Sequence, residues 1–428
     1  MFLRTFQDRT MRRAATRRPS HGEAPPEGID GERPARDISV ERFVDRSENA
    51  ASHFGEGEGE GEGDGAVVLD ARIEAVRRRG RGAIANPSGR YEPESRVAFD
   101  DGWGSLDDLP PFTTEVTIEK PKSILTRNSS PDVPFDRSIN PYRGCEHGCS
   151  YCFARPTHAY MGLSPGLDFE SRLFVKPDAA RLLERELGVA GYACRPIAIG
   201  TNTDPYQPIE RRFRLMREIL EVLERCGHPV TIVTKSALVL RDADILGRMG
   251  AKGLAKVALS VTTLDRRLSR SMEPRASAPE KRLAAIRGLA EAGVPVGVMI
   301  APVIPALNDA EVERILEAAA EAGAREAGYI LLRLPLEVSE IFKDWLLEHH
   351  PDRYRHVLSL LRAMREGKDY DAAWGRRMRG SGPYATTLRK RFEAATRRLG
   401  LAKGSGRVEL TCDLFVPPLG DGRQLSLF

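Results

Sequence analysis

The stretch Ser138-Ile-Asn-Pro-Tyr-Arg-Gly-Cys145-Glu-His-Gly-Cys149-Ser-Tyr-Cys152 decides the fold. Its first residues have the pattern of a short buried β-strand, and three cysteines follow at once in C-x3-C-x2-C spacing. The other cysteines, Cys194, Cys226 and Cys412, are scattered, so a disulfide framework is not indicated. Clustered thiols without such a framework are typical of a metal site or of redox chemistry.

The spacing of the three clustered thiols favours an iron–sulfur cluster. Three thiolates from one short loop can bind three corners of a cubane cluster, and no fourth cysteine lies nearby for the last iron. A Cys3His zinc site completed by His147 is the alternative, although structural zinc usually pairs two separate knuckles. A third interpretation is a chance cluster of inert core cysteines. Gly144 and Gly148 argue against it, because they allow the loop to fold tightly.

Short apolar runs alternate with amphipathic helical patterns from residue 138 onward. The predicted strands cover residues 138–142, 196–199, 230–234, 257–261, 294–301 and 328–332. The predicted helices lie near residues 178–188, 209–226, 240–250, 279–292 and 309–323. Six such alternations imply a parallel sheet, and six strands are too few for a closed eight-stranded barrel. We therefore predict an α/β fold, a partial (β/α)6 TIM-like barrel, with its site at the carboxyl ends of the strands.

Three further regions surround this predicted core of residues 111–340. Residues 1–110 are predicted to be largely disordered, because they contain a Gly/Glu tract at 55–65 that can bury nothing. The basic stretch Arg77-Arg-Arg-Gly-Arg81 reads as a solvated linker or as an arm that contacts nucleic acid. Residues 341–420 are predicted as a basic helical extension, followed by a tail at 421–428.

Composition and charge narrow the function classes only slightly. The chain has 428 residues, 41% of them hydrophobic, and a net charge of +4, which is ordinary for a globular protein. No apolar run approaches the roughly 18 residues of a membrane helix. The first twenty residues carry six arginines without the apolar stretch of a signal peptide, which leaves a transit peptide as the alternative to a flexible start. We predict a cytoplasmic protein.

The cysteine loop resembles the signature of the radical S-adenosylmethionine (SAM) superfamily, with Tyr151 as the aromatic of C-x3-C-x-aromatic-C. The resemblance covers roughly residues 138–340. It implies an enzyme with a [4Fe–4S] cluster on Cys145, Cys149 and Cys152, whose open iron binds SAM through its amino and carboxylate groups. It also implies that an external electron donor drives cleavage of SAM to methionine and a 5′-deoxyadenosyl radical, which abstracts hydrogen from the substrate.

Polar residues recur at the ends of successive strands, where the resemblance places SAM. The turn at 201–204 is suited to an ammonium group, Lys235 to the methionine carboxylate and Ser260 to ribose hydroxyls. Each of them alone is more typical of a cap or turn residue, and their recurrence favours a binding role. The predicted cofactor-binding residues are Tyr151, Thr201, Asn202, Asp204, Lys235 and Ser260.

A closer resemblance is to the DNA repair photolyase-like branch, which includes the spore photoproduct lyases. The matching residues are Val233-Thr-Lys235, Leu259-Ser-Val261, Met272-Glu-Pro274, Lys281-Arg282 and Ile300-Ala-Pro302. Those lyases carry a hydrogen-donating cysteine after the second strand, where this chain has Gly200-Thr-Asn202. We therefore predict a different substrate or a different donor, with Tyr206 as a candidate. Glu273 and Arg282 form a pair near the site or a surface ion pair.

Nucleic acid is the predicted partner, DNA more than RNA. From residue 341 to the end there are 17 Lys and Arg against 10 Asp and Glu. The clusters at 376–379, 389–391 and 397–398 are suited to phosphates, and Tyr384 on a flexible turn is suited to stack on a base. A solvated helical face is the alternative reading.

The tail Gln424-Leu-Ser-Leu-Phe428 resembles the peptide by which bacterial replication and repair proteins dock on the sliding clamp. Packing on the protein's own surface is the alternative. The predicted function is a radical SAM enzyme that acts on nucleic acid in a repair-like, lyase-type reaction. The alternatives are an RNA-modifying enzyme of the same chemistry and a non-catalytic, clamp-tethered iron–sulfur protein that binds nucleic acid.

Overall fold

The computed structural model describes residues 73–92, 110–401 and 408–418. Its main sheet has seven strands in the order β10-β9-β8-β7-β6-β3-β2, and every neighbouring pair is parallel except β2 and β3. The predicted α/β fold with a parallel sheet is thus confirmed, and its strand order is consistent with the predicted partial barrel. The strands are β2 (Leu125–Arg127), β3 (Arg137–Ile139), β6 (Ile197–Ile199), β7 (Val230–Thr234), β8 (Ala255–Ser260), β9 (Val296–Val303) and β10 (Glu326–Leu331).

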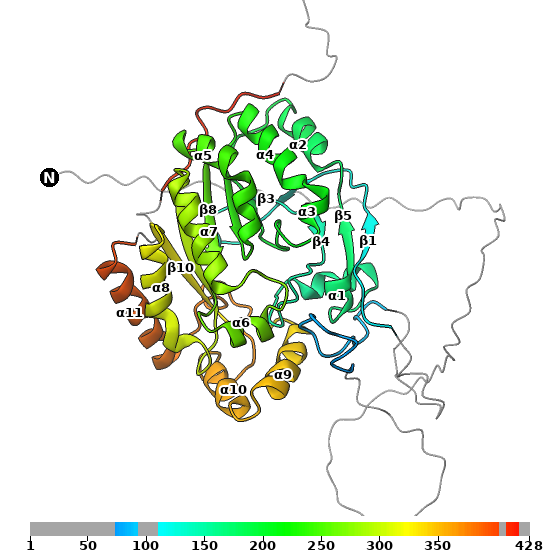
Figure 1. Cartoon of the computed structure of the whole chain (residues 1–428), viewed down its shortest axis with the longest axis vertical. Helices are drawn as coiled ribbons and strands as arrows, with labels where there is room; N and C mark the ends of the chain where they lie inside the picture. Colours follow the sequence, from blue (N-terminus) through cyan, green and yellow to red (C-terminus); the bar gives the residue numbers. More distant parts are fainter. Residues whose placement is uncertain (1–72, 93–109, 402–407, 419–428) are drawn as a thin grey trace, which may run out of the picture. The chain divides into compact units, whose positions relative to one another are not determined.

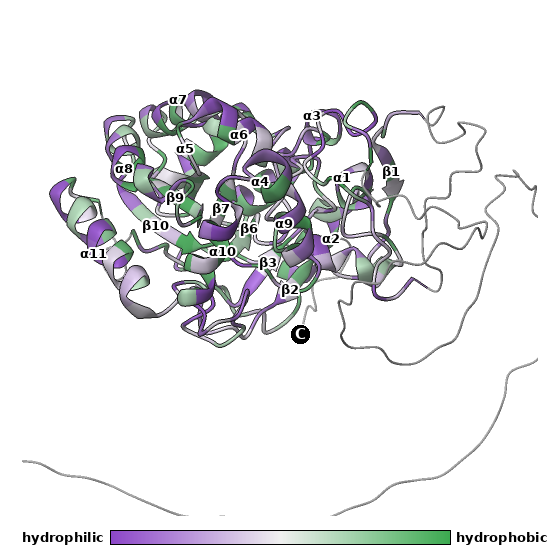
Figure 2. Ribbon diagram, turned by 90° about the horizontal axis from the view of Figure 1, so that it is seen from below, coloured by the Kyte–Doolittle hydropathy of each residue, from purple (hydrophilic) through white to green (hydrophobic). Residues whose placement is uncertain are grey.

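Amphipathic helices pack on one face of this sheet (Figure 1). Their apolar residues form one hydrophobic core with the strands, and Figure 2 shows purple and green residues side by side on α8 and α11. The helices of this layer are α2 (Ala179–Leu187), α4 (Leu215–Arg225), α5 (Ala243–Ala251), α7 (Pro279–Glu291), α8 (Val312–Glu321) and α11 (Gly382–Arg398). The short elements that accompany them are α3 (Glu210–Phe213), η3 (Ala237–Asp242) and η4 (Asp309–Glu311).

The other face of the sheet is the inner face of the partial barrel. Strands β7, β8 and β9 alternate between buried residues, which pack against the helices, and partly exposed ones. Because successive side chains of a strand point to opposite faces, the partly exposed set lies on the inner face. Lys235 and Ser260 are in phase with that set, so the sheet presents both where β7 and β8 end.

A second hydrophobic core lies beyond the carboxyl ends of the strands. It contains Phe342, Trp345 and Leu361, which belong to the predicted C-terminal helices, together with Cys149 and Tyr151. The helices around it are α6 (Arg266–Met272), α9 (Val338–His349) and α10 (Tyr354–Ala363). A small sheet that was not predicted flanks this region, with α1 (Asp168–Ser171), η1 (Arg155–Thr157), η2 (Ala159–Met161) and the strands β1 (Glu115–Ile118), β5 (Arg172–Val175) and β4 (Tyr142–Arg143).

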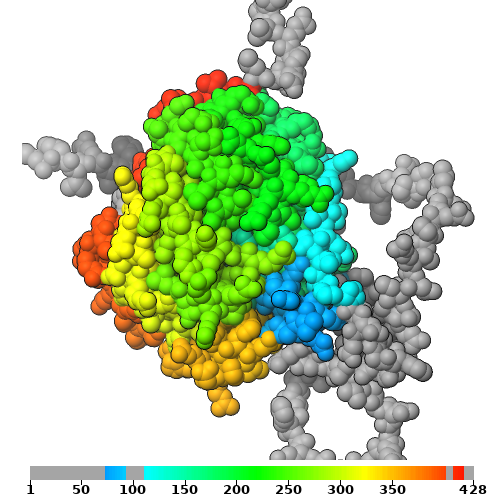
Figure 3. Space-filling view, viewed as in Figure 1, coloured from blue at the N-terminus to red at the C-terminus, as the bar shows by residue number. Residues whose placement is uncertain are grey.

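Residues 73–92 belong to the folded core, which corrects the predicted boundary at residue 110. Ala83 and Ile84 are buried, and Arg81 is buried as well rather than part of a solvated linker or arm. Arg78 forms an ion pair with Glu348 of α9. Figure 3 shows this segment in blue, on the surface between the cyan residues and the orange helices.

Ion pairs join the basic C-terminal region to the rest of the fold. Arg391 of α11 pairs with Glu313 of α8 at 2.7 Å, and Arg377, in the turn before α11, pairs with Asp132 at 2.5 Å. Tyr384 does not present a free aromatic ring at a flexible turn, which corrects that prediction, because it lies in α11 and donates a hydrogen bond to Asp309. The predicted tail motif at 424–428 lies outside the described residues.

None of the helices within residues 73–92, 110–401 and 408–418 has both the length and the apolar character needed to cross a bilayer.

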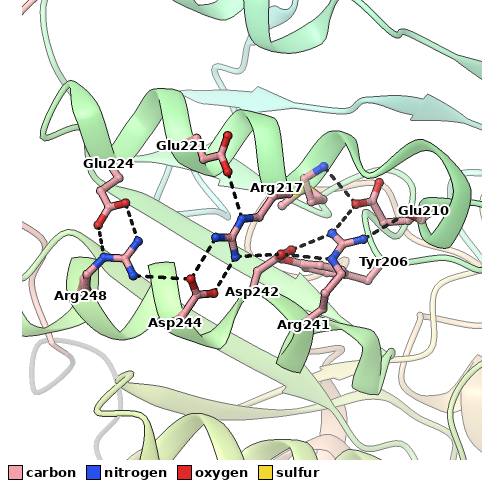
Figure 4. A network of polar contacts seen from close by, with 10 residues as sticks. Tyr206, Glu210, Arg217, Glu221, Glu224, Arg241, Asp242, Asp244 and Arg248 are labelled. Carbon is pink, nitrogen blue, oxygen red and sulfur yellow. Dashed lines mark hydrogen bonds and ion pairs between the residues drawn. The ribbon is translucent and has the colours of Figure 1, made fainter.

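A polar network joins α3, α4 and the start of α5 (Figure 4). At its centre the fully buried carboxylate of Asp242 accepts hydrogen bonds from the Tyr206 hydroxyl at 3.1 Å and from Arg241 at 2.7 Å. Arg241 also pairs with the buried Glu210 at 2.6 Å. The buried charges of this network are therefore stabilised by their ion-pair partners in place of water.

Asp242→Ala is expected to lower the free energy of unfolding by about 3 kcal/mol, because it leaves the buried Tyr206 hydroxyl without its acceptor and Arg241 with Glu210 as its remaining partner. Asp244→Ala is the matched control, since Asp244 pairs with Arg217 in the same network but its side chain is 50% exposed. The control should cost about 1 kcal/mol or less. Urea unfolding of the cluster-free protein measures the free energy of unfolding of both variants. Equal decreases would show that the buried Asp242 contributes no more than the exposed Asp244.

Candidate functional site

The cysteine loop, residues 145–152, lies at the carboxyl ends of the parallel strands. Gln207, which follows β6 and is fully buried, holds the start of this loop through two hydrogen bonds. Its side-chain oxygen accepts from the Glu146 N–H at 2.9 Å, and its amide nitrogen donates to the Gly144 carbonyl at 3.1 Å. Gln207 was not singled out from the sequence, because a lone glutamine carries no motif.

The rest of the loop is pinned through its backbone. The Cys145 N–H donates to the Phe169 carbonyl at 2.9 Å, and the Ser150 N–H donates to the Met272 carbonyl at 3.0 Å. Gly148 has φ +67°, a left-handed conformation that favours glycine, which agrees with the tight turn expected from the sequence. The three thiols are therefore presented by a loop whose backbone is hydrogen-bonded to the neighbouring elements.

Residues 81–84 are connected to this loop through the buried residues Glu170 and Arg155. The N–H groups of Gly82 and Ala83 donate to the two carboxylate oxygens of Glu170, each at 2.8 Å. Glu170 is also ion-paired with Arg155, and both side chains are fully buried. Arg155 in turn donates to the Cys149 carbonyl at 2.9 Å. A chain of three contacts thus connects the N-terminal segment to a cysteine of the loop.

The contact between the two backbones is close. A Cβ atom added at Gly82 would lie 1.7 Å from the carbonyl oxygen of Gly148 in the loop. Two residues further on, Ile84 packs in the same hydrophobic cluster as Cys149 and Tyr151. None of this was predicted, and the apolar pair Ala83-Ile84 after a run of arginines and glycines was the only sequence signal for it.

Glu273 and Arg282 form a fully buried ion pair beside the loop, so the reading of them as a surface pair is wrong. Glu273 accepts hydrogen bonds from the Tyr151 hydroxyl and, at 2.6 Å, from Thr262. Arg282 donates to the Ser260 carbonyl at 3.0 Å. The pair therefore connects the cysteine loop with the end of β8 and with α7.

Lys235 extends from the end of β7 toward the loop, with its Nζ 5.7 Å from the centre of the Tyr151 ring. Burial lowers the pKa of Lys235, but the neighbouring Cys149 and Glu273 outweigh burial and raise it. The side chain therefore remains a cation. A cation at this strand end is suited to bind a carboxylate group.

Asp204, after β6, orients its neighbours. Its carboxylate accepts from the Thr234 hydroxyl at 2.7 Å and from the Lys235 N–H at 2.8 Å, and it lies 3.4 Å from Nδ1 of His147 in the loop. Burial raises the pKa of Asp204, but His147 and these hydrogen bonds outweigh it and lower the pKa to about 2. The expected contact of Asp204 with an ammonium group stays a prediction.

The remaining residues that were predicted to bind the cofactor lie at the end of β8 and in the turn after β6. Ser260 is buried and donates to the Ala301 carbonyl at 3.2 Å. Thr201 and Asn202 lie in the turn after β6, where the Asn202 N–H donates to the Asn140 side chain at 3.2 Å. Tyr206 faces away from the loop into the network of Figure 4, which corrects its prediction as a hydrogen donor.

The residues of the loop fit a three-thiolate cluster. Cys145 and Cys149 are buried, Cys152 is partly exposed, and the buried Ser150 hydroxyl has no hydrogen-bond partner among the described residues, which leaves it available to a sulfur acceptor. Burial raises the pKa of Cys149 to about 12, while the Lys235 cation opposes that shift. Because iron binds the thiolate form, such a cation assists ligation.

The geometry differs from that of a single-ion site. Within the described residues no group of three or more His, Cys, Asp or Glu side chains surrounds one metal-ion position. A cubane distributes its three protein ligands over three iron corners, so its thiolates need not converge on one point.

Gly82→Ala is expected to reduce the iron and sulfide bound per chain several-fold, because its Cβ would push the 73–92 segment and the cysteine loop apart. Gly80→Ala is the control. Gly80 has φ +76° and open space around it, so its substitution costs about 1–2 kcal/mol of backbone strain without touching the loop. Iron and sulfide analysis after anaerobic reconstitution compares the two, and normal cluster content in Gly82→Ala would contradict the role of the contact.

Comparison with known proteins identifies the family. Residues 139–319 match the model of the Radical SAM superfamily. The chain is 38% identical over 230 residues to the uncharacterized protein Rv2578c of Mycobacterium tuberculosis, a match that covers 53% of this chain and 68% of that relative. It is 31% identical over 219 residues to the uncharacterized protein MJ0683 of Methanocaldococcus jannaschii, which covers 51% and 78%.

Among solved structures, spore photoproduct lyase complexed with dinucleoside spore photoproduct is similar with a TM-score of 0.47 and 15% identity, over 66% of this chain and 79% of that one. The three-cysteine loop at the carboxyl edge of a parallel sheet agrees with the family match. The chain belongs to the radical SAM superfamily, whose enzymes use a [4Fe–4S] cluster and S-adenosylmethionine.

Proposed function

We propose that this radical SAM enzyme acts on nucleic acid, in a repair-type reaction on DNA. The observation that carries the proposal is a set of arginine–aromatic groups with exposed rings, two of which include residues that closely follow the cysteine loop. Aromatic rings stack on bases of any sequence, and arginines neutralise phosphates and stack as well. Such groups beside the reactive centre suit a single-stranded or unstacked nucleotide.

The first group contains Arg90, Tyr91 and Tyr160. The two tyrosine rings stack with centroids 5.3 Å apart, and the Arg90 guanidinium lies 5.4 Å and 5.9 Å from their centres. Tyr91 is 57% exposed and Tyr160 is 68% exposed. Tyr160 lies in η2, which follows the cysteine loop closely, so the stack stands beside the loop.

The second group begins directly after Cys152. Phe153 is 44% exposed, and the Arg333 guanidinium lies 5.0 Å from its ring centre. Arg333 follows β10, and its buried Nε has no hydrogen-bond partner among the described residues. A third, separate pair is formed by Trp374, which is 56% exposed, and Arg377, whose guanidinium lies 4.1 Å from the ring centre. Because Nε of Arg333 lacks an acceptor, an anionic ligand would stabilise this side chain.

The inner face of the barrel supplies the residues for the cofactor. When bound, the cluster and S-adenosylmethionine supply reductive cleavage of a carbon–sulfur bond to give a radical that abstracts hydrogen. Lys235 is the residue that we assign to the cofactor carboxylate, and Ser260 is the adjacent hydroxyl. The turn Gly200-Thr-Asn202 holds no thiol, so we propose a reaction different from that of the spore photoproduct lyases.

Cleavage of SAM is expected from the anaerobically reconstituted protein with dithionite, measured as 5′-deoxyadenosine. Cys149→Ala should abolish the product, because the cluster loses one of three ligands. Cys226→Ala is the control, a buried thiol outside the loop that should leave product formation unchanged. A fully loaded cluster that never cleaves SAM, with nucleic acid present, would contradict the catalytic proposal and favour the non-catalytic iron–sulfur protein.

Phe153→Ala is expected to weaken binding of a labelled single-stranded oligonucleotide about tenfold, since one stacked base contributes about 1–3 kcal/mol. Arg333→Ala should weaken binding as well. It should also reduce the slope of the logarithm of the binding constant against the logarithm of the salt concentration by about one. Arg287→Ala, an exposed residue of α7 on the outer layer, is the control and should change neither.

The same titration separates the alternatives. Fluorescence anisotropy with single-stranded DNA, duplex DNA and RNA of one sequence ranks the substrates. Tighter binding of RNA than of either DNA would favour the RNA-modifying alternative. Equal affinities of wild type, Phe153→Ala and Arg333→Ala would remove the arginine–aromatic groups as the nucleic-acid surface.

A further inference from the structure

The described residues 408–418 lie along the amino ends of the parallel strands, opposite the cysteine loop. The Thr411 N–H donates to the carbonyl of Gly253, just before β8, at 3.1 Å, and the Val416 N–H donates to that of Cys226, before β7, at 2.9 Å. Figure 1 shows this segment in red at the top of the molecule. The segment thus crosses from one strand start to the next.

Aromatic packing fixes the middle of the segment. The Phe415 ring lies 5.5 Å from that of Tyr192 and 5.3 Å from that of His228. Arg137 donates to the Ala193 carbonyl at 2.7 Å and so holds the chain next to Tyr192. The residues that precede β6 and the 408–418 segment therefore lie side by side.

Each of these adjoining segments carries one cysteine. Cys194 follows the Ala193 that Arg137 holds, and Cys412 follows the Thr411 that is bonded to Gly253. Cys412 is also a neighbour that raises the pKa of Cys194, and both side chains are partly exposed. Neither residue belongs to the cysteine loop. Two neighbouring thiols at a solvent-accessible seam are placed for oxidation to one disulfide.

We propose that Cys194 and Cys412 form a reversible disulfide that fixes the 408–418 segment to the amino end of the sheet. The oxidant is a low-molecular-weight disulfide such as oxidised glutathione. The proposal is independent of the reaction at the cysteine loop.

The exchange takes two steps. One of the two thiols attacks, as its thiolate, one sulfur of the oxidant, whose S–S bond breaks and releases one thiolate. The other thiol then attacks the protein sulfur of the mixed disulfide, a step that the proximity of the two segments accelerates, and displaces the second thiolate.

The exchange is balanced. The two protein thiols are oxidised to one disulfide, and the two thiolates that leave the oxidant take up the two S–H protons. The reverse reaction needs only an excess of a thiol, so the bond would respond to the ratio of glutathione to its disulfide.

The test uses the full-length, reconstituted protein, incubated anaerobically with oxidised glutathione, alkylated and digested without reduction for mass spectrometry. The expected product is a peptide pair joined through Cys194 and Cys412 that dithiothreitol separates. Cys226→Ala, which removes a neighbouring buried thiol, should leave this product unchanged. Glutathione on both residues without a joined pair, or no reaction at either, would overturn the proposal.

The single variants test whether both thiols are needed. Cys194→Ser and Cys412→Ser should each accumulate glutathione on the remaining thiol without a joined pair, because the second thiol is missing. The oxidised wild type should also melt at a higher temperature than the reduced form, a difference that Cys412→Ser abolishes. A joined pair without such a difference would show that the bond does not fix the segment.

Discussion

The buried ion pair between Glu273 and Arg282 is the interaction on which the site depends. Removing two charges from water costs several kcal/mol per ion unless the remaining polar positions are satisfied. Here Glu273 also accepts hydrogen bonds from Tyr151 and Thr262, and Arg282 donates to backbone carbonyls of the strand end and the helix start. Burial raises the pKa of Glu273, but Arg282 and Lys235 outweigh it and lower that pKa, so the pair stays ionised. Because its partners come from three separate elements, the pair fixes the cysteine loop relative to the sheet.

This arrangement explains why a lysine can remain charged beside a buried cysteine. A Cys149 thiolate and the Glu273 carboxylate raise the pKa of Lys235 against the effect of burial. Arg282 opposes that shift and Asp204 adds to it, so two cations and two carboxylates act on one another here. The charge of Lys235 is therefore supported by acidic groups from several elements, and the thiolate form of Cys149, which iron binds, adds to that support.

The strands and the three cysteines could be predicted because both are local patterns. The six predicted parallel strands coincide with β3 and β6–β10 to within three residues at each end, since buried runs and helical periodicity are visible in short windows. The contacts that shape the site are not local. Gly82 and Glu170 lie 88 residues apart, and the arginines and glycines around residue 80 have the composition of a linker. Tyr206 was misjudged for the same reason, since the sequence placed it near a strand end but did not show that Asp242 holds its hydroxyl elsewhere.

The functional unit extends beyond the part of the chain that carries the family pattern. That pattern covers residues 139–319, whereas Gly82 and Ala83 occupy both oxygens of Glu170, inside the pattern, from outside it. Without these two N–H donors the buried Glu170 would be left with Arg155 as its main partner, and Arg155 is the residue that holds the Cys149 carbonyl. A loop restrained by fewer hydrogen bonds samples more conformations, and ordering it on ligand binding then costs conformational entropy. The N-terminal segment therefore preorganises the thiols, and the family pattern alone does not build the site.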